Sequence, residues 1–228
     1  RNYDVKYEHG TLKMEYGEQI AITIKAKDGT WEYDGTAHSD AGVEITNGEL
    51  LEGDVLEATA SGSVTNVADN AEDNNTVNEG YRIMNGGTDV TGKYAITVEA
   101  GTLRITPKPV TITAASETFT YDGQAHSNDD YEVSGLVGED ALEATVEGSI
   151  TYPGEEPNTV VSHSFTAGDV RNYDVKYEHG TLKMEYGDQI ELTIIADDGE
   201  WVYDGTSHSQ GTYTYGGNLI SGDELTVT

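Results

Sequence analysis

The residues best suited to metal chemistry lie in one acidic stretch, residues 68–75, which reads ADNAEDNN. Asp69, Glu72 and Asp73 supply carboxylate oxygens, the ligands that hard Ca²⁺ prefers. The stretch lacks the ligand spacing and the bidentate glutamate of an EF-hand loop, and most acidic runs are solvated surface. These three residues are candidate Ca²⁺ ligands, and we expect no other metal and no cofactor.

Two tryptophans, Trp31 and Trp201, are the residues best suited to stacking on a sugar ring. Each precedes a Tyr-Asp-Gly motif, and Phe119 takes the same place before the middle motif. A large aromatic residue at one position in every copy is more often a core side chain than an exposed binding platform. The tryptophans are therefore candidate ligand-binding residues, with a structural role favoured.

The histidines do not follow the pattern of a catalytic or metal site. Three of them, His38, His126 and His208, follow the Tyr-Asp-Gly motif once per copy instead of converging on one pocket. A serine comes directly after each, but neighbouring residues on a strand point to opposite faces, which argues against a Ser-His dyad. We predict no catalytic residue and no enzymatic activity.

The charge of the chain limits the kinds of partner that it can bind. The chain has 12 Lys and Arg residues and 42 Asp and Glu residues, which gives a net charge of −30, and it has no cysteine. A polyanion cannot neutralise phosphates and gains nothing from an anionic membrane, so nucleic acid and direct membrane insertion are disfavoured. Without cysteine there is no disulfide framework, and stability must come from packing and strand pairing.

Internal repeats dominate the sequence. RNYDVKYEHGTLKMEYG occupies residues 1–17 and recurs unchanged at 171–187, while Tyr-Asp-Gly motifs begin at Tyr33, Tyr121 and Tyr203. Such spacing is typical of tandem modules. We predict four segments: 1–17, the closing hairpin of a preceding module; 18–107, a full module of type A; 108–187, a full module of type B; and 188–228, the front of a further A-type module.

The elements that carry these motifs are predicted to be β-strands. Apolar residues alternate with polar ones at the start of each module, as in Ile20, Ile22 and Ile24, and this period of two indicates a half-buried strand. The closing stretches are predicted to be β-hairpins that turn at a glycine, such as Gly101. We predict an all-β fold of tandem small Ig-like β-sandwich modules arranged as an elongated rod. Residues 68–90 are predicted to be an insertion peculiar to the A-type module.

In the module from Lys108, PVTITA at Pro109, TYDG at Thr120, GLVGEDALEATVEG at Gly135, NYDV at Asn172 and GTLKM at Gly180 appear in that order. This combination resembles the MBG-type repeats, which carry a Tyr-Gly or Tyr-Asp-Gly motif and occur in tandem in large bacterial surface proteins. The resemblance covers nearly the whole chain and implies an extracellular segment of a cell-surface adhesin. It supplies no catalytic residues.

These observations favour a non-catalytic stalk or spacer that extends a distal binding domain from the bacterial cell, with neighbouring modules of the same protein as its partners. Two alternatives stay open. The modules themselves could bind a host glycan or protein, with residues 68–90 as the contact. They could also self-assemble into a filament by strand exchange, because a bare sheet edge accepts an added strand.

Overall fold

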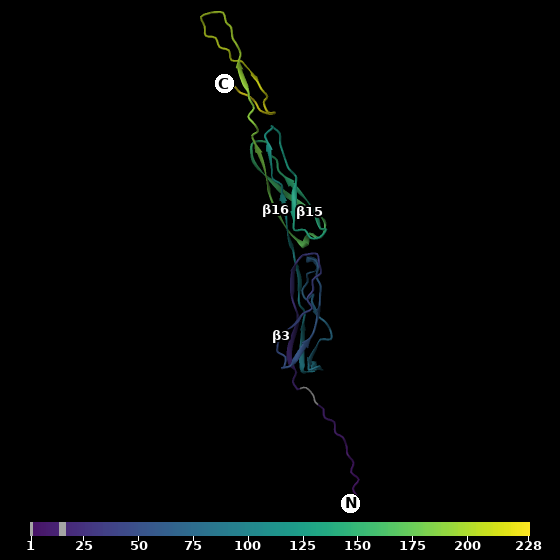
Figure 1. Ribbon diagram of the computed structural model, residues 1–228. Coiled ribbons are helices and arrows are strands. Elements are labelled where there is room, and N and C mark those ends of the chain that lie inside the picture. Colours follow the sequence, from purple (N-terminus) through teal and green to yellow (C-terminus); the bar gives the residue numbers. More distant parts are fainter. Residues whose placement is uncertain (1, 14–16) are drawn as a thin grey trace. The chain divides into compact units, whose positions relative to one another are not determined.

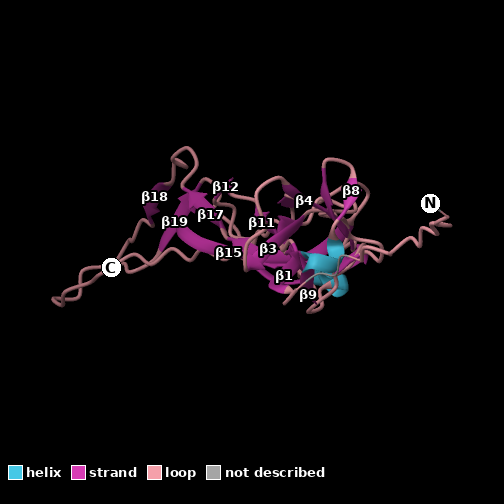
Figure 2. Ribbon diagram, turned by 90° about the horizontal axis from the view of Figure 1, so that it is seen from below, coloured by secondary structure: helices cyan, strands magenta, loops and turns pink. Residues whose placement is uncertain are grey.

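The computed structural model describes residues 2–13 and 17–228. Its strands lie between residues 20 and 216 and are joined by turns and loops (Figure 1). Helical structure among them consists of three single turns of 3-10 helix: η1 (Val67–Asp69), η2 (Thr91–Lys93) and η3 (Val170–Asn172) (Figure 2). The prediction of an all-β chain is confirmed. Within the described ranges, no helix is long and apolar enough to pass through a membrane.

The chain divides into two compact units. Unit 1 comprises Arg1–Lys108 and Val170–Tyr173, and unit 2 comprises Pro109–Asp169 and Asp174–Thr228. The predicted A-type module, 18–107, lies in unit 1. Most of the predicted B-type module lies in unit 2 together with residues 188–228.

Unit 1 contains four small sheets. Their orders are β3-β1-β9, β10-β2, β4-β7-β8 and β5-β6. The bounds are β1 (Ile20–Ala26), β2 (Gly29–Glu32), β3 (Val43–Asn47), β4 (Asp54–Glu57), β5 (Ala60–Ser61), β6 (Thr76–Val77), β7 (Arg82–Asn85), β8 (Thr88–Asp89), β9 (Tyr94–Glu99) and β10 (Leu103–Thr106).

The core of unit 1 follows the alternation seen in the sequence. Ile22 and Ile24 of β1 are buried, as the period of two predicts, and they pack with Ile83 of β7, Val90 and Tyr94. The sheet built on β1 therefore buries one face against the sheet that holds β7.

The prediction that each module closes with a hairpin is wrong. β9 pairs with β1 and β10 pairs with β2, both in parallel, so the two closing strands belong to different sheets. At Gly101 the chain crosses between the sheets instead of reversing. A Cβ at that position would collide with the carbonyl oxygens of Ala26 and Lys27, which explains the glycine.

Residues 2–13 form no strand and are exposed, so they do not adopt the hairpin predicted for residues 1–17. Residues 14–16 of that segment, including Met14, lie outside the described residues. The identical sequence at 171–187 does form strands, β16 (Tyr173–Glu178) and β17 (Gly180–Glu185), because strands from residues 108–120 lie beside them. The segment needs partner strands, since isolated strands gain too little to stay ordered.

Unit 2 repeats the plan of unit 1. Its sheets have the orders β13-β11-β16, β12-β17-β15-β14 and β18-β19, and Val110, Ile112, Leu182 and Met184 are buried. The bounds are β11 (Lys108–Ala114), β12 (Glu117–Thr120), β13 (Tyr131–Ser134), β14 (Ala141–Glu147), β15 (Gly154–Ala167), β16 (Tyr173–Glu178), β17 (Gly180–Glu185), β18 (Thr193–Ala196) and β19 (Tyr213–Gly216).

Residues 68–90 are not a separate insertion, which corrects the sequence interpretation. They include β6 and β7, and Ile83 of β7 is fully buried in the core. Asn75 in this segment occupies the place that Asn158 of β15 takes in unit 2, since both amides bind the loop after the opening strand. The shared Asn-Thr-Val triplet at Asn75 and Asn158 is the sequence signal of this equivalence.

Candidate functional site

The three Tyr-Asp-Gly motifs form one kind of turn. Asp34 Oδ1 accepts the backbone N–H of Thr36 at 2.8 Å and its hydroxyl at 2.7 Å, and Gly35 has a φ of 78°. Glycine suits this left-handed region because it has no Cβ. Asp122 and Asp204 each accept the backbone N–H two residues on at 2.9 Å. The motif therefore encodes an Asx turn.

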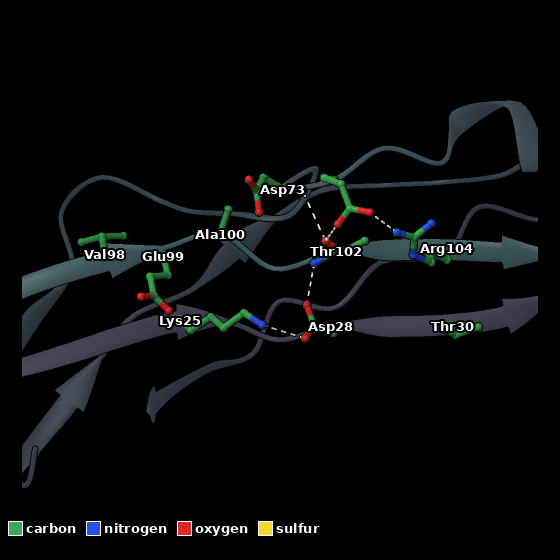
Figure 3. A pocket seen from close by; sticks show the side chains of 10 residues that line it. Lys25, Asp28, Thr30, Asp73, Val98, Glu99, Ala100, Thr102 and Arg104 are labelled. Carbon is green, nitrogen blue, oxygen red and sulfur yellow. Dashed lines mark hydrogen bonds and ion pairs between the residues drawn. The ribbon is translucent and has the colours of Figure 1, made fainter. Parts of the chain in front are cut away.

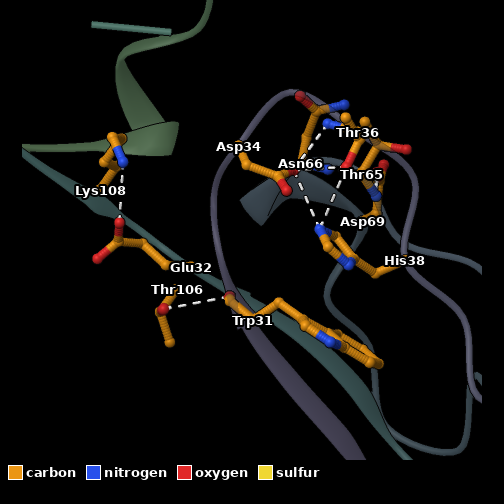
Figure 4. A network of polar contacts seen from close by, with 10 residues as sticks. All are labelled: Trp31, Glu32, Asp34, Thr36, His38, Thr65, Asn66, Asp69, Thr106 and Lys108. Carbon is orange, nitrogen blue, oxygen red and sulfur yellow. Dashed lines mark hydrogen bonds and ion pairs between the residues drawn. The ribbon is translucent and has the colours of Figure 1, made fainter. Parts of the chain in front are cut away.

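At each turn a histidine stacks on the aromatic ring that precedes the motif, and Figure 4 shows His38 beside Trp31 in the first copy. His38 Nε2 lies 3.0 Å from Asp34 Oδ1, and its ring stacks on Trp31 with a centroid distance of 5.0 Å. His126 stacks on Phe119 at 4.8 Å in the second copy. Sequence reasoning missed this pairing, although the constant spacing between aromatic residue and histidine could have indicated it.

This stacking bears on the candidate ligand-binding residues. Trp31 has His38 on its ring, and Trp201 has His208 at a centroid distance of 5.5 Å while remaining 46% exposed. Trp31 is partly buried and packs against a residue of the turn that follows it. Trp201 keeps more of its ring open to solvent.

A glycine makes room for each tryptophan. A Cβ on Gly29 would overlap the six-membered ring of Trp31, and Gly199 has the same relation to Trp201. At residues 108–187 the equivalent position is Glu117, and there the aromatic residue is the smaller Phe119. The A-type and B-type modules therefore differ by a matched pair of residues, not by one substitution.

The turn holds its aspartate ionised. The Thr36 hydroxyl, the Thr36 backbone N–H and His38 together lower the pKa of Asp34 from 3.8 to about 2. Asp122 has a lowered pKa chiefly because of its hydrogen bond with His126, and Asp204 chiefly because of the Thr206 hydroxyl. The carboxylates are therefore charged hydrogen-bond acceptors down to acidic pH.

The Asp-His-hydroxyl grouping is not arranged as a proton relay. His38 Nε2 faces both Asp34 Oδ1, at 3.0 Å, and the Thr36 hydroxyl, at 3.4 Å. A relay uses the two ring nitrogens separately, one for the carboxylate and one for the nucleophile. The hydroxyl also donates to Asp34, and Gln124 replaces the threonine in the motif that begins at Tyr121. The chemistry of this site is that of a stabilised turn.

The three candidate Ca²⁺ ligands have different roles in the structure. Asp69 Oδ2 accepts the backbone N–H groups of Thr65 and Asn66, at 2.9 and 2.8 Å, and these bonds lower the pKa of Asp69. Its carboxylate therefore caps the start of η1. In the part of the chain that the structure describes, no group of three or more His, Cys, Asp or Glu side chains is placed to hold a metal ion.

Glu72 and Asp73 line an open polar cleft of about 720 Å³ (Figure 3). Glu72 forms an ion pair with Arg104, and the Asp73 N–H donates to the Thr102 hydroxyl at 3.2 Å. On the other wall, Asp28 accepts the Thr102 N–H at 2.7 Å. Four charged side chains of the cleft, Lys25, Asp28, Glu72 and Arg104, thus pair with one another or with a backbone group.

Two asparagines of the acidic stretch take the place of a strand. Asn74 bonds both the N–H and the C=O of Leu103, at 2.7 and 2.9 Å, and Asn70 does the same for Ile105. In unit 2, β15 pairs with the equivalent edge of β17. Side-chain amides therefore satisfy the outer edge of β10, a role that sequence reasoning missed.

A third asparagine is buried between the opening and closing strands. Asn75 is fully buried; its Nδ2 donates to the carbonyls of Lys27 and Asp40 at 2.8 and 2.9 Å, and its backbone exchanges two hydrogen bonds with Gly101. Asn158 donates in the same way to two loop carbonyls of unit 2. Each side-chain amide thus joins the loop after β1 or β11 to the loop that precedes β3 or β13.

Comparison with known proteins adds no relative: no family model, no curated protein and no solved structure matches the chain.

Proposed function

We propose that this chain is a run of tandem, Ig-like β-sandwich modules that serves as a non-catalytic spacer, forming part of an elongated extracellular stalk on a bacterial cell surface. The stalk would hold a distal binding domain away from the envelope. Its partners would be neighbouring modules of the same protein.

The observation that carries the proposal is the path of the chain through the A-type module. It enters along β1 and β2 and leaves along β9 and β10, which run parallel to them. The entry at Ile20 and the exit at Thr106 therefore lie at opposite ends of the paired strands. At ~3.3 Å per residue, the run from Ile20 to Glu32 advances the chain by about 40 Å.

Two further features support the proposal. Each copy builds its own turn from an aspartate, a histidine and an aromatic residue at the same spacing, as expected of modules that share one fold. The net charge of −30 disfavours aggregation of an exposed protein at high local density.

Small-angle X-ray scattering of the chain, with Ca²⁺ and then with a chelator, tests the proposal. We expect an elongated monomer whose maximum dimension is the same in both conditions. A compact particle would contradict a spacer. A mass above one chain would favour assembly instead, and a rod that loosens on chelation would make Ca²⁺ a structural partner.

A further inference from the structure

The opening and closing strands of the A-type module form one uninterrupted register. Ile20 pairs with Tyr94 and Lys25 with Glu99 in the first sheet. In the second sheet Gly29 pairs with Leu103 and Glu32 with Thr106, with no slip between the two sets. Residues 20–32 and 94–106 therefore lie side by side in one register, with a break in the strand pairing at residues 26–28 and 100–102. Figure 3 shows β2 and β10 pointing the same way.

The gap between the two sets of pairs is bridged. Gly29 N–H donates to the Thr102 carbonyl at 3.0 Å, and Asp28 accepts the Thr102 N–H. Asn75 binds the Lys27 carbonyl on one side and Gly101 on the other. Hydrogen bonding thus continues across the point where both strands change sheets.

The paired strands are also shielded from water. Ile22, Ile24, Tyr94, Leu103 and Ile105 are all buried. Backbone hydrogen bonds beside buried side chains are protected from competing water molecules, which would otherwise open them one at a time.

Unit 2 also pairs an opening strand with a closing strand in parallel. β12 pairs with β17 in parallel, from Glu117 with Leu182 to Thr120 with Glu185. The Tyr121 N–H donates to the Glu185 carbonyl at 2.8 Å, as the Tyr33 N–H donates to the Thr106 carbonyl in unit 1 at 2.9 Å. The parallel pairing is therefore a property of both module types.

We propose that each module is a mechanical clamp that resists tension applied along the chain. Tension on the two ends of a module pulls adjacent parallel strands in opposite directions along their axes. All the hydrogen bonds between them then bear the load together, whereas force applied at one end of the pair would break them in turn. This inference rests on the proposed stalk function, which would place the modules under tension when the distal domain binds.

Single-molecule force spectroscopy of the full chain tests the clamp by changing only the points of attachment. The chain has no cysteine, so handles can be attached at introduced cysteine pairs. Glu18→Cys with Pro107→Cys pulls the A-type module from its entry and exit. Lys27→Cys with Glu99→Cys pulls β1 and β9 apart from one end. All four positions are exposed.

We expect a several-fold higher rupture force for the first pair at the same loading rate, because forced unfolding follows the unfolding rate and only the first geometry loads the bonds together. Both double variants should have the same melting temperature as the parent chain, which shows that attachment did not alter the fold. Equal forces, or a lower force for the first pair, would overturn the clamp. The stalk proposal is tested separately by the scattering measurement, which does not depend on this result.

Discussion

At the scale of single residues, several polar side chains form hydrogen bonds with backbone groups. Asp34 accepts hydrogen bonds from Thr36, Asp69 from Thr65 and Asn66, and Asn75 donates to two carbonyls. Buried or turn-forming backbone groups must find such partners, because leaving them without one costs free energy. Aspartate and asparagine are short enough to supply them locally.

The pKa of Asp34 leads to a prediction about acid stability. Its pKa is lowered in the folded state, to about 2 from 3.8, so its contribution to stability is complete above about pH 4 and is lost as pH falls toward 2. We therefore expect the difference in melting temperature between the parent chain and Asp34→Ala to be constant near neutral pH and to shrink over that acidic range. Thermal melts followed by circular dichroism would measure it. A difference that stays constant down to pH 2 would contradict the assignment.

The fit between Gly29 and Trp31 gives a second prediction. Gly29→Ala places a Cβ against the indole ring and should lower the free energy of unfolding by about 1–3 kcal/mol, the usual cost of overpacking. Trp31→Phe in the same chain should recover part of the loss, because the copy at residues 117–119 combines a side chain, Glu117, at that position with Phe119. Urea unfolding of both single variants and the double variant gives the coupling between them.

Thr30→Ala is the matched control for this cycle, since Thr30 is the next residue of β2 and its side chain is exposed. It should change stability little. If the two substitutions at Gly29 and Trp31 were simply additive, the proposed pairing of the two positions would be wrong.

At the scale of the elements, the feature that bears on association with other chains is how the edges of the strands are covered. β10 has β2 on one side and the amides of Asn70 and Asn74 on the other, so its outer edge does not offer free N–H and C=O groups at Leu103 and Ile105. Exposed strand edges invite pairing with other chains, and proteins commonly cover them.

Removing this cover should promote association. The double variant Asn70→Ala, Asn74→Ala loses four hydrogen bonds and bares the edge of β10, so we expect lower stability, by about 1 kcal/mol for each bond, and a shift toward oligomers. Sedimentation velocity would detect the oligomers. Glu72→Gln is the control in the same loop, because its exposed ion pair with Arg104 should contribute only about 0–1 kcal/mol. A double variant that stays as monomeric as the control would argue against edge protection.

At the scale of the whole molecule, the excess of acidic residues should make stability depend on salt. Like charges repel most when the chain is folded and compact, and salt screens them. Raising the ionic strength from ~0.01 to ~0.15 M shortens the screening length from about 30 to about 8 Å, so the melting temperature should rise. The same step near pH 4, where many carboxylates are protonated, should raise it less. A melting temperature that falls with salt would mean that ion pairs such as Lys25–Asp28 outweigh the repulsion.

Local chemistry explains what the sequence by itself determined. The alternation of Ile22 and Ile24 indicates which face of β1 is buried, and an Asp-Gly pair indicates a turn, because both depend only on neighbouring residues. The repeated strings likewise show that the copies share one plan. The all-β class and the buried faces of the opening strands could be predicted on these grounds.

Only the tertiary structure decided which edges pair and what the asparagines do. A period of two identifies the buried face of a strand but not its neighbour, so the parallel pairing of β1 with β9 and of β2 with β10 was not predictable, and a hairpin was expected instead. Asn70, Asn74 and Asn75 looked like part of a solvated acidic loop for the same reason. Their roles depend on backbone groups of Leu103, Ile105 and Lys27, which folding alone brings within hydrogen-bonding distance.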